Sequence, residues 1–256
     1  MLQLTADRRS RADELAETYR LLFAACDGAL RVELAVRPPS GGHWRGADTL
    51  ACSVEELVAA ESARITAEHG RAPRTHVAAS RILHHYLWSV CLLVSGPWYL
   101  ERQVPQLRAG DLWIDPADGR LAVRPGEWVV GDESELRTAL AAHLGPVLAA
   151  FQPYVRRGPR ALWGMAADDL LSGIWYLGRV LGEEDHAVEA AAAVLPGDTP
   201  PFPGAAEFRR LPGTEGRSHW TRTRAGCCLY YAVDPAQACL TCPRTGDEER
   251  VARLEA

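Results

Sequence analysis

The stretch that decides the fold runs from Thr75 to Leu100 and reads THVAASRILHHYLWSVCLLVSGPWYL. Its apolar residues recur every three or four positions, which is the period of an α-helix with one wide apolar face. The spacing therefore predicts a long helix at the centre of the core. Its most apolar part, residues 87–100, is interrupted at residues 95–97 and is too short to cross a bilayer, so we expect no membrane span.

The segments on either side of this helix show the same period and predict further helices. An amphipathic pattern from Ser10 to Asp27 ends at a glycine. Ser53-Val54-Glu55-Glu56 has the form of a capping box, in which a Ser side chain bonds the amide three residues later, so we expect a helix to begin there and to end at His69. Three more helices are expected at residues 132–154, 159–181 and 186–195.

Two segments have the character of β-structure. Residues 30–36 alternate apolar and polar side chains, which is the pattern of a strand with one buried face. Residues 113–123 place a Pro-Ala-Asp-Gly turn between two short β-prone runs and predict a hairpin. The fold class expected from these elements is α+β and mainly helical.

The densest Pro and Gly segment, residues 196–204, cannot continue a helix and is the best candidate for a boundary. We therefore predict a large helical domain over residues 1–200 and a C-terminal metal-cluster-binding segment over residues 201–256. From Phe208 onward there is little room for an independent hydrophobic core, so this segment needs a metal site and contacts with the helices to hold it.

Composition narrows the classes of function. The 256-residue chain has a net charge of −5 and no lysine, and its arginines are scattered along the sequence, which argues against a nucleic-acid partner. Residues 1–20 are rich in Arg, Asp and Glu and lack the apolar run and small-residue cleavage site of a secretory signal. We therefore expect a cytoplasmic protein.

Four of the seven cysteines fall within sixteen residues: Cys227, Cys228, Cys239 and Cys242. In a reducing compartment such crowding favours a metal or redox site over disulfides. Four soft sulfur ligands suit either Zn²⁺ or an iron–sulfur cluster. We expect the other three cysteines, Cys26, Cys52 and Cys91, to be small buried structural thiols.

The spacing of the four cysteines helps to choose between zinc and a cluster. Only Cys239 and Cys242 form the Cys-x-x-Cys knuckle typical of structural zinc sites. In an extended segment the adjacent Cys227 and Cys228 point to opposite sides, so binding one ion with both requires a bend, which Gly226 would supply. A two-iron cluster tolerates this geometry better.

The cysteine pattern also resembles a known motif. Cys227-Cys228, ten intervening residues, Cys239-x-x-Cys242 and the following proline are similar to the [2Fe-2S] site of the FhuF-type ferric-siderophore reductases. Three neighbours agree with that motif: Arg224, Leu229 and Tyr231. More broadly, residues 79–86 resemble the Ser-containing helix of the family's N-terminal domain, and residues 162–167 resemble its Leu-Trp-Gly segment. The resemblance thus spans most of the chain after residue 75.

Two departures from the family pattern bear on function. Gly226 stands where a serine is expected before the cysteine pair, and His84-His85 stand where a basic pair is more usual. The first change affects hydrogen bonding to a cluster sulfur and hence the potential. The second change affects which substrate the protein uses.

The resemblance implies a ferric-siderophore reductase with a [2Fe-2S] cofactor held by the four cysteines. Reduction weakens the hold of hard anionic oxygens on iron, so one electron releases Fe²⁺ from a siderophore. No acid, base or nucleophile is required beyond the cluster. The chain has no Gly-x-Gly-x-x-Gly fingerprint, so the electrons must come from an external donor such as a ferredoxin or a flavin reductase.

Candidate substrate-binding residues are taken from the polar stripe of the central helix and from the neighbours of the cysteines: Arg81, His84, His85, Arg224 and Tyr230. A hydrogen-bonded buried stripe is the plainer interpretation for the helix residues, and packing is the plainer one for Trp220, Tyr230 and Tyr231. Arg222, Arg224 and Arg244 either offset the charge of a thiolate site or are ordinary surface arginines. Asp168-Asp169 are expected on a solvated helix face.

Two other functions remain open from the sequence. One is a zinc-stabilised structural or interaction protein in siderophore handling, and the other is an iron–sulfur redox sensor. The sensor is disfavoured because no basic recognition helix is evident.

Overall fold

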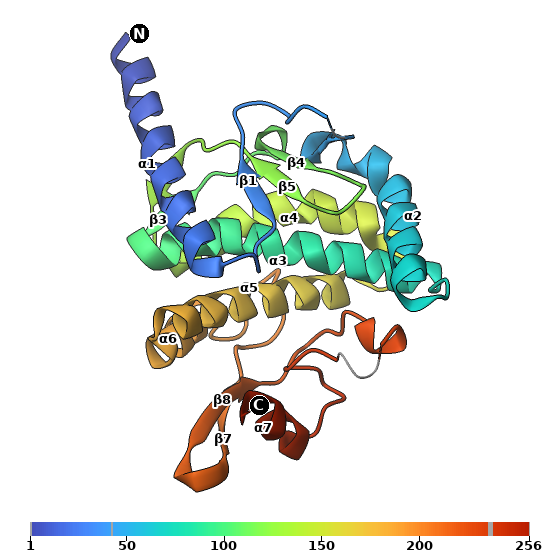
Figure 1. Ribbon diagram of the computed structural model, residues 1–256. Helices are drawn as coiled ribbons and strands as arrows, with labels where there is room; N and C mark the ends of the chain where they lie inside the picture. The colour runs from blue at the N-terminus through green and yellow to red at the C-terminus, as the bar shows by residue number, and fades with distance from the viewer. Residues whose placement is uncertain (1, 42, 235–237, 256) are drawn as a thin grey trace.

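The computed structural model describes residues 2–41, 43–234 and 238–255 (Figure 1). Across these ranges the chain is 59% helix and 12% strand, and it contains seven α-helices. The strands form small sheets at the edges of the helical body. The expected mainly helical α+β fold is confirmed.

Helix α3 (Thr75–Glu101) lies at the centre of the molecule, as its apolar pattern predicted (Figure 1). Helices α2 (Leu50–His69), α4 (Glu133–Val155) and α5 (Pro159–Leu181) pack around it, and many of its side chains are fully buried. By length and composition alone α3 could span a membrane, but 78% of its most apolar window is buried inside the protein. It is the central core helix, and the described residues contain no other helix of that kind.

The N-terminal helices differ from the sequence expectation at their starts. Helix α1 (Leu2–Cys26) begins earlier than predicted, and α2 begins at Leu50 after a short 3-10 turn at Ala47–Thr49. The predicted capping box is therefore wrong, because Ser53 lies inside the helix and its hydroxyl donates to the Thr49 carbonyl at 3.3 Å. The predicted end is right, since Gly70 closes α2 in the left-handed conformation that favours glycine.

The second half of the helical body follows the sequence closely. Asp132 caps α4 by accepting from the amides of Ser134 and Glu135 at 2.8 and 3.1 Å. Helix α5 begins at a proline in its first turn and ends before Gly182, and α6 (Glu184–Val194) packs directly against it. The side of α5 that faces away from α3 carries the C-terminal segment (Figure 1).

A four-stranded sheet covers the side of α3 that faces away from α5 (Figure 1). Its strands are in the order β1-β5-β4-β2. The predicted hairpin is β4 and β5, paired antiparallel, and the predicted N-terminal strand shortens to β1, which pairs with β5 in parallel. A separate antiparallel pair, β3 with β6, lies beside the end of α3. The strand bounds are β1 Val32–Leu34, β2 Arg45–Gly46, β3 Gln103–Pro105, β4 Leu112–Ile114, β5 Leu121–Val123 and β6 Trp128–Val130.

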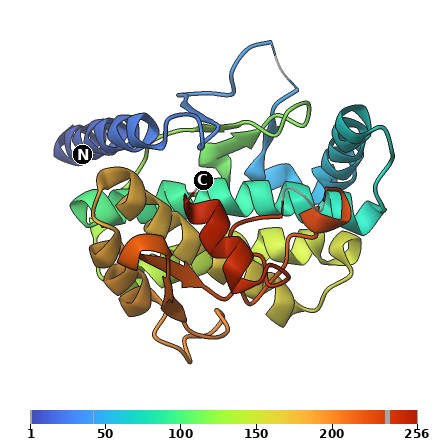
Figure 2. The ribbon, with the colours of Figure 1, turned by 60° about the horizontal axis from the view of Figure 1, so that its bottom comes forward.

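The C-terminal segment has secondary structure that the sequence did not predict. An antiparallel hairpin of β7 (Phe208–Pro212) and β8 (Ser218–Arg222) leads into the cysteine-rich loop, and α7 (Asp247–Glu255) follows it. The segment lies across α5 on the side away from the sheet (Figure 2). The division into domains at residue 200 stays a prediction.

Candidate functional site

All four clustered cysteines lie in the loop between β8 and α7, against α5 and α3. Cys228 and Cys242 are 4% and 2% exposed, while Cys227 and Cys239 are half-buried. The other cysteines lie outside this group. Cys26 and Cys91 are buried as expected, but Cys52 is exposed on α2, so its prediction as a buried thiol is wrong.

The backbone bends directly after the adjacent cysteines. Leu229 adopts the left-handed conformation with φ of 64°, and its amide donates to Cys227 Sγ at 3.4 Å. The backbone also bends at Ala225, directly before Gly226, so a bend supplied by Gly226 stays a prediction. The bend at Leu229 turns a backbone N–H toward a sulfur, which stabilises negative charge on it.

Gly226 allows the loop to approach α5 closely. A Cβ at this position would lie 3.0 Å from Met165 Cγ and 3.2 Å from Asp168 Oδ2. The Gly226 amide donates to the same Oδ2 at 2.6 Å. A serine at this position would be in tighter than ordinary contact, so Met165 or the loop would have to shift by a few tenths of an ångström.

Three arginines fasten the loop backbone at other points. Arg157, in the turn before α5, donates to the Cys227 carbonyl at 2.7 Å. Arg250 of α7, 3% exposed, donates to the Cys242 carbonyl at 2.8 Å, and Arg253 of the same helix donates to the Ala238 carbonyl at 2.5 Å. Helix α7 therefore holds the second half of the cysteine loop.

The thiols are close enough to influence one another. A hydrogen bond between Cys228 and Cys239 lowers the pKa of the Cys228 thiol and raises that of Cys239. Burial raises the pKa of Cys227, and the charges of Cys228 and Cys242 raise it further. The four sulfurs thus share one electrostatic environment.

A buried carboxylate joins the loop to α5. Asp168 is fully buried, and its Oδ1 accepts from Arg222 Nη2 at 2.7 Å and from the Ala225 amide at 3.0 Å. The expectation that Asp168 and Asp169 lie on a solvated face is therefore wrong. No local signal in the sequence placed these two acids in the interior, because their arginine partners lie more than fifty residues away in the chain.

The second buried carboxylate connects α3 to the loop. Asp169 Oδ2 lies 2.9 Å from Nδ1 of His84, and its Oδ1 lies 3.4 Å from Nη2 of Arg224. Arg224 in turn donates from Nη1 to Cys239 Sγ at 3.6 Å. A continuous polar chain therefore runs from His84 on the central helix to a sulfur of the site.

Arg222 and Arg224 are structural parts of this site and are not surface arginines. Burial lowers the pKa of Arg222, which Asp168 offsets. Burial acts in the same direction on Arg224, but Asp169, Asp168 and the nearby thiols outweigh it and raise its pKa. Arg224 therefore stays cationic beside the sulfurs. Arg244 is exposed, with its guanidinium 3.9 Å from the centre of the Tyr231 ring.

A pocket of about 390 Å³ opens beside Cys239, between α3 and α5. Four of the five predicted substrate-binding residues line it: Arg81, His84, His85 and Arg224. The fifth, Tyr230, lies outside the lining and supports Arg81, whose guanidinium lies 3.9 Å above the Tyr230 ring. Trp88, which adjoins the polar stripe of the central helix, and Trp175 and Tyr176, which the sequence did not single out, form an aromatic wall of the pocket.

The walls of this pocket are held by further contacts. Trp88 donates to the Ala29 carbonyl at 3.2 Å, and Tyr176 donates to the Cys26 carbonyl at 3.0 Å. The two rings meet edge to face at 5.6 Å. The aromatic wall is therefore fixed against α1 and the turn that follows it. Trp220 lies apart and donates to Asp185 at 2.6 Å.

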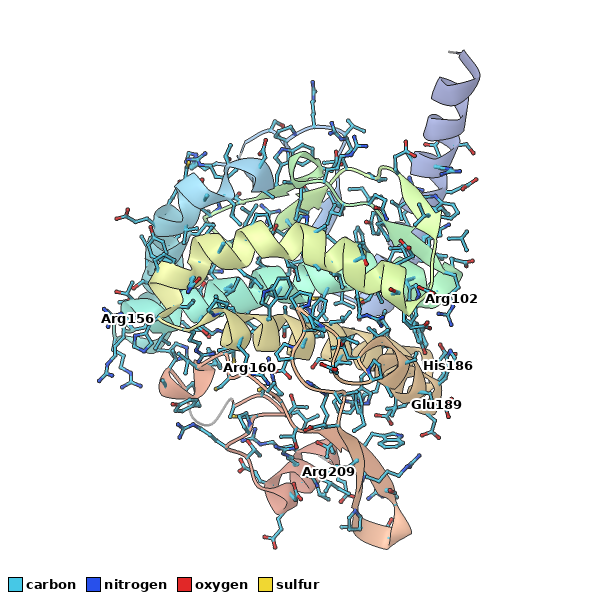
Figure 3. All side chains as sticks on the ribbon, turned by 180° about the vertical axis from the view of Figure 1, so that it is seen from behind. Arg102, Arg156, Arg160, His186, Glu189 and Arg209 are labelled. Carbon is cyan, nitrogen blue, oxygen red and sulfur yellow. The ribbon has the colours of Figure 1, made fainter. Side chains whose placement is uncertain are left out.

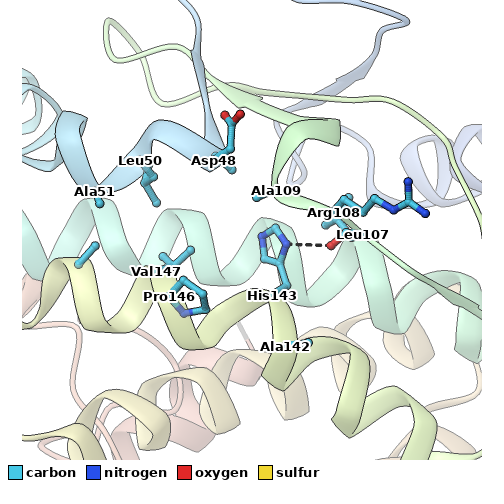
Figure 4. Close-up of a pocket in the computed structure, with 12 residues that line it drawn as sticks. Asp48, Leu50, Ala51, Leu107, Arg108, Ala109, Ala142, His143, Pro146 and Val147 are labelled. Atoms are coloured by element: carbon cyan, nitrogen blue, oxygen red, sulfur yellow. Dashed lines mark hydrogen bonds between the residues drawn. The ribbon is translucent and has the colours of Figure 1, made fainter.

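A second pocket, of about 240 Å³, lies between α2, α4 and the segment at residues 107–109 (Figure 4). It contains His143, whose Nδ1 donates to the Leu107 carbonyl at 3.1 Å. The other ring nitrogen lies 2.9 Å from the Tyr86 hydroxyl. Both nitrogens are occupied, and burial lowers the pKa of this histidine, so it is a neutral core side chain.

The donor set fits a thiolate-bound cofactor. The four cysteines lie in one loop, and a backbone amide and a guanidinium point at the sulfurs of Cys227 and Cys239, which is the kind of surrounding that compensates a negatively charged cluster. Among the described residues, no three His, Cys, Asp or Glu side chains are arranged to hold a single metal ion.

These features define a class of thiolate-rich sites suited to a sulfur-bound metal centre. Residues 224–244 match the family model of the FhuF 2Fe-2S C-terminal domain, and this range contains all four clustered cysteines. This match confirms the FhuF-like resemblance at the cysteine motif, and the cofactor is a [2Fe-2S] cluster. The resemblances at residues 79–86 and 162–167 stay predictions. A search of curated proteins found no match to the chain.

Proposed function

We propose that the protein is a ferric-siderophore reductase. The observation that carries the proposal is the pocket that borders Cys239 directly. A small molecule in that pocket touches the edge of the cysteine site without entering it. The volume of the pocket, about 390 Å³, lies near the lower end of the roughly 300–1,000 Å³ range of small-molecule sites. The pocket therefore accommodates the iron centre of a chelate, with the rest of the siderophore outside.

Cys227, Cys228, Cys239 and Cys242 are the proposed ligands of the [2Fe-2S] cluster. When bound, the cluster supplies one electron at a time, which is what converts chelated Fe³⁺ to the more weakly held Fe²⁺. Side chains of the protein position the cluster and the ferric chelate relative to each other. Arg224 holds positive charge beside Cys239, and Asp169 fixes both Arg224 and His84.

The reaction needs no proton donor, base or nucleophile at the pocket, because no bond to the protein forms or breaks. The electron must come from an external donor, for which we propose a ferredoxin or a flavin reductase. A cytoplasmic location fits such donors and the reduced state of the thiols. We propose no nucleic-acid partner.

The test uses protein purified without oxygen. Iron and acid-labile sulfide should be present in equal amounts, and the visible absorption should bleach with dithionite and return when a ferric siderophore is added. Cys239→Ser should abolish the visible absorption and destabilise the C-terminal segment, because one of four ligands is lost. Cys52→Ser, at an exposed thiol on α2, is the matched control and should leave the spectrum unchanged.

Two results would end this proposal. A colourless protein with one zinc and no sulfide would support the zinc-stabilised interaction protein. A normal cluster whose reduced form is never reoxidised by any ferric chelate would favour a redox sensor.

A further inference from the structure

The pocket beside Cys239 has an unusual balance of charge for this chain. The whole protein carries a net charge of −5, yet three arginines line the pocket: Arg81, Arg179 and Arg224. Among the described lining residues, Asp169 supplies the one carboxylate, and it is already engaged with His84 and Arg224. Arg224 is also engaged with Cys239, so Arg81 and Arg179 are the lining cations left for a substrate.

Arg81 is held in a fixed orientation at the pocket. Its guanidinium lies over the Tyr230 ring, and its Nη2 is 3.1 Å from Nε2 of His85. The side chain of His85 is exposed at the pocket, and partial desolvation together with the positive charge of Arg81 lowers its pKa. His85 is therefore neutral and accepts from Arg81, which remains the cation.

Arg179 has a different character, because it lies at the rim. Its side chain is 44% exposed, and its nearest carboxylate oxygen is on Glu184 at 3.9 Å, beyond good hydrogen-bond distance. Trp175 lies below it, with 5.6 Å between the guanidinium and the ring centre. A rim cation with a loose partner is free to turn toward an incoming anion.

Ferric chelates differ in net charge according to their ligand groups. Each hydroxamate contributes one negative charge, so a complete hydroxamate shell only neutralises Fe³⁺. Carboxylate and hydroxycarboxylate ligands leave an excess of negative charge around the metal. Recognition of such oxygens by guanidinium groups is favourable because the donors of arginine match carboxylate geometry.

We propose that this pocket selects ferric chelates of net negative charge, of the carboxylate type, and that Arg81 and Arg179 recognise them. The inference rests on the proposed reductase function and names its substrate class. Trp88 and Tyr176 also line this pocket and give it an apolar surface beside the arginines.

Binding is tested with gallium chelates and the holoprotein, because Ga³⁺ has the charge of Fe³⁺ but accepts no electron under these conditions. Isothermal titration calorimetry at low salt should show Ga³⁺ citrate binding about tenfold more tightly than the cationic Ga³⁺ complex of desferrioxamine B. High salt should narrow this difference, because screening weakens exposed ion pairs.

Two variants assign the recognition to named residues. Arg179→Gln and Arg81→Gln should each weaken citrate binding roughly two- to fivefold, as expected for partly exposed ion pairs, and should leave the hydroxamate complex unchanged. Arg160→Gln is the matched control, because Arg160 is exposed at the start of α5 (Figure 3), roughly 13 Å along the helix from Asp169.

The outcomes separate this inference from the function on which it rests. Equal affinity for both gallium complexes, or equal weakening by Arg160→Gln and Arg179→Gln, overturns the charge selection. If ferric citrate and ferrioxamine B both fail to reoxidise the reduced holoprotein, the reductase function is overturned whatever the gallium preference. If both reoxidise it and citrate shows no preference, only the substrate class is wrong.

Discussion

Asp168 is the residue whose loss should separate the cysteine loop from the helical body. Its carboxylate is fully buried in α5 and accepts from the Arg222 guanidinium and from the amides of Ala225 and Gly226. Asp168→Asn keeps the shape of the side chain but removes its charge. The amide group also places a donor where one of these groups needs an acceptor.

The expected cost follows from what remains unpaired. Arg222 is 1% exposed, so removing its carboxylate leaves a buried guanidinium without a counter-charge. Breaking one side of a buried ion pair costs about 3–5 kcal/mol, and a lost hydrogen bond to a charged group costs about 1.5–3 kcal/mol on its own. Because these effects overlap, we expect Asp168→Asn to lower the free energy of unfolding by about 3–5 kcal/mol.

The assay is urea unfolding of the holoprotein, followed by far-UV circular dichroism and by visible absorption. The visible signal should be lost at a lower urea concentration than in the wild type. Asp185→Asn is the control, since Asp185 also accepts from an arginine and a tryptophan but its side chain is 72% exposed, and it should cost less than about 1 kcal/mol. If Asp168→Asn changes stability as little as Asp185→Asn, the loop is not held by this carboxylate.

Three further predictions concern the loop, the site and the core. Gly226→Ser should destabilise the holoprotein by about 1–3 kcal/mol through its clash with Met165, whereas Gly246→Ser, with open space around it, should be neutral in the same thermal melt; equal effects would contradict the close approach. Arg224→Gln should make the midpoint of a redox titration more negative, because a cation near the sulfurs favours the reduced state, and Arg224→Lys should largely restore it; an unchanged midpoint would rule out the contact with Cys239. Burial lowers the pKa of His143 below 6.5, so its contribution to stability is complete above pH 6.5 and is lost as the pH falls through the lowered value. The free energy of unfolding should thus fall less between pH 7.5 and 5.5 in His143→Gln than in the wild type, and equal falls would show that another group is responsible.

The helical body could be predicted well because its signals are local. The central helix, the helix from Pro159 to Leu181 and the turn of the 113–123 hairpin are each specified by residues within a few positions of one another. The capping box at Ser53 failed because a preceding 3-10 turn already begins that helix at Leu50. The capping-box pattern is a local signal, and the 3-10 turn at Ala47–Thr49 had the larger effect on where the helix begins.

For the candidate site, the four cysteine ligands stay a prediction from their spacing, and the residues that support their loop were missed. The cysteine spacing pointed to the loop, and the neighbouring arginine pointed to its charge compensation. Asp168 and Asp169 were assigned to solvent because their partners, Arg222 and Arg224, lie more than fifty residues away in the chain. No local pattern shows that a distant arginine will fill the space beside a carboxylate.

The sequence alone determined the mainly helical class, the order of most helices, the cysteine motif and the kind of cofactor that it holds. These depend on side-chain period and on spacing within one segment, which the chain carries whatever its tertiary structure. Tertiary structure alone decided that α5 carries the loop on two buried carboxylates, that Gly226 packs closely against α5, and that an arginine-lined pocket borders Cys239. Those features arise where α3, α5 and the C-terminal loop meet. There, residues from separate segments are buried together, and each buried charge is stabilised by an opposite charge from another segment.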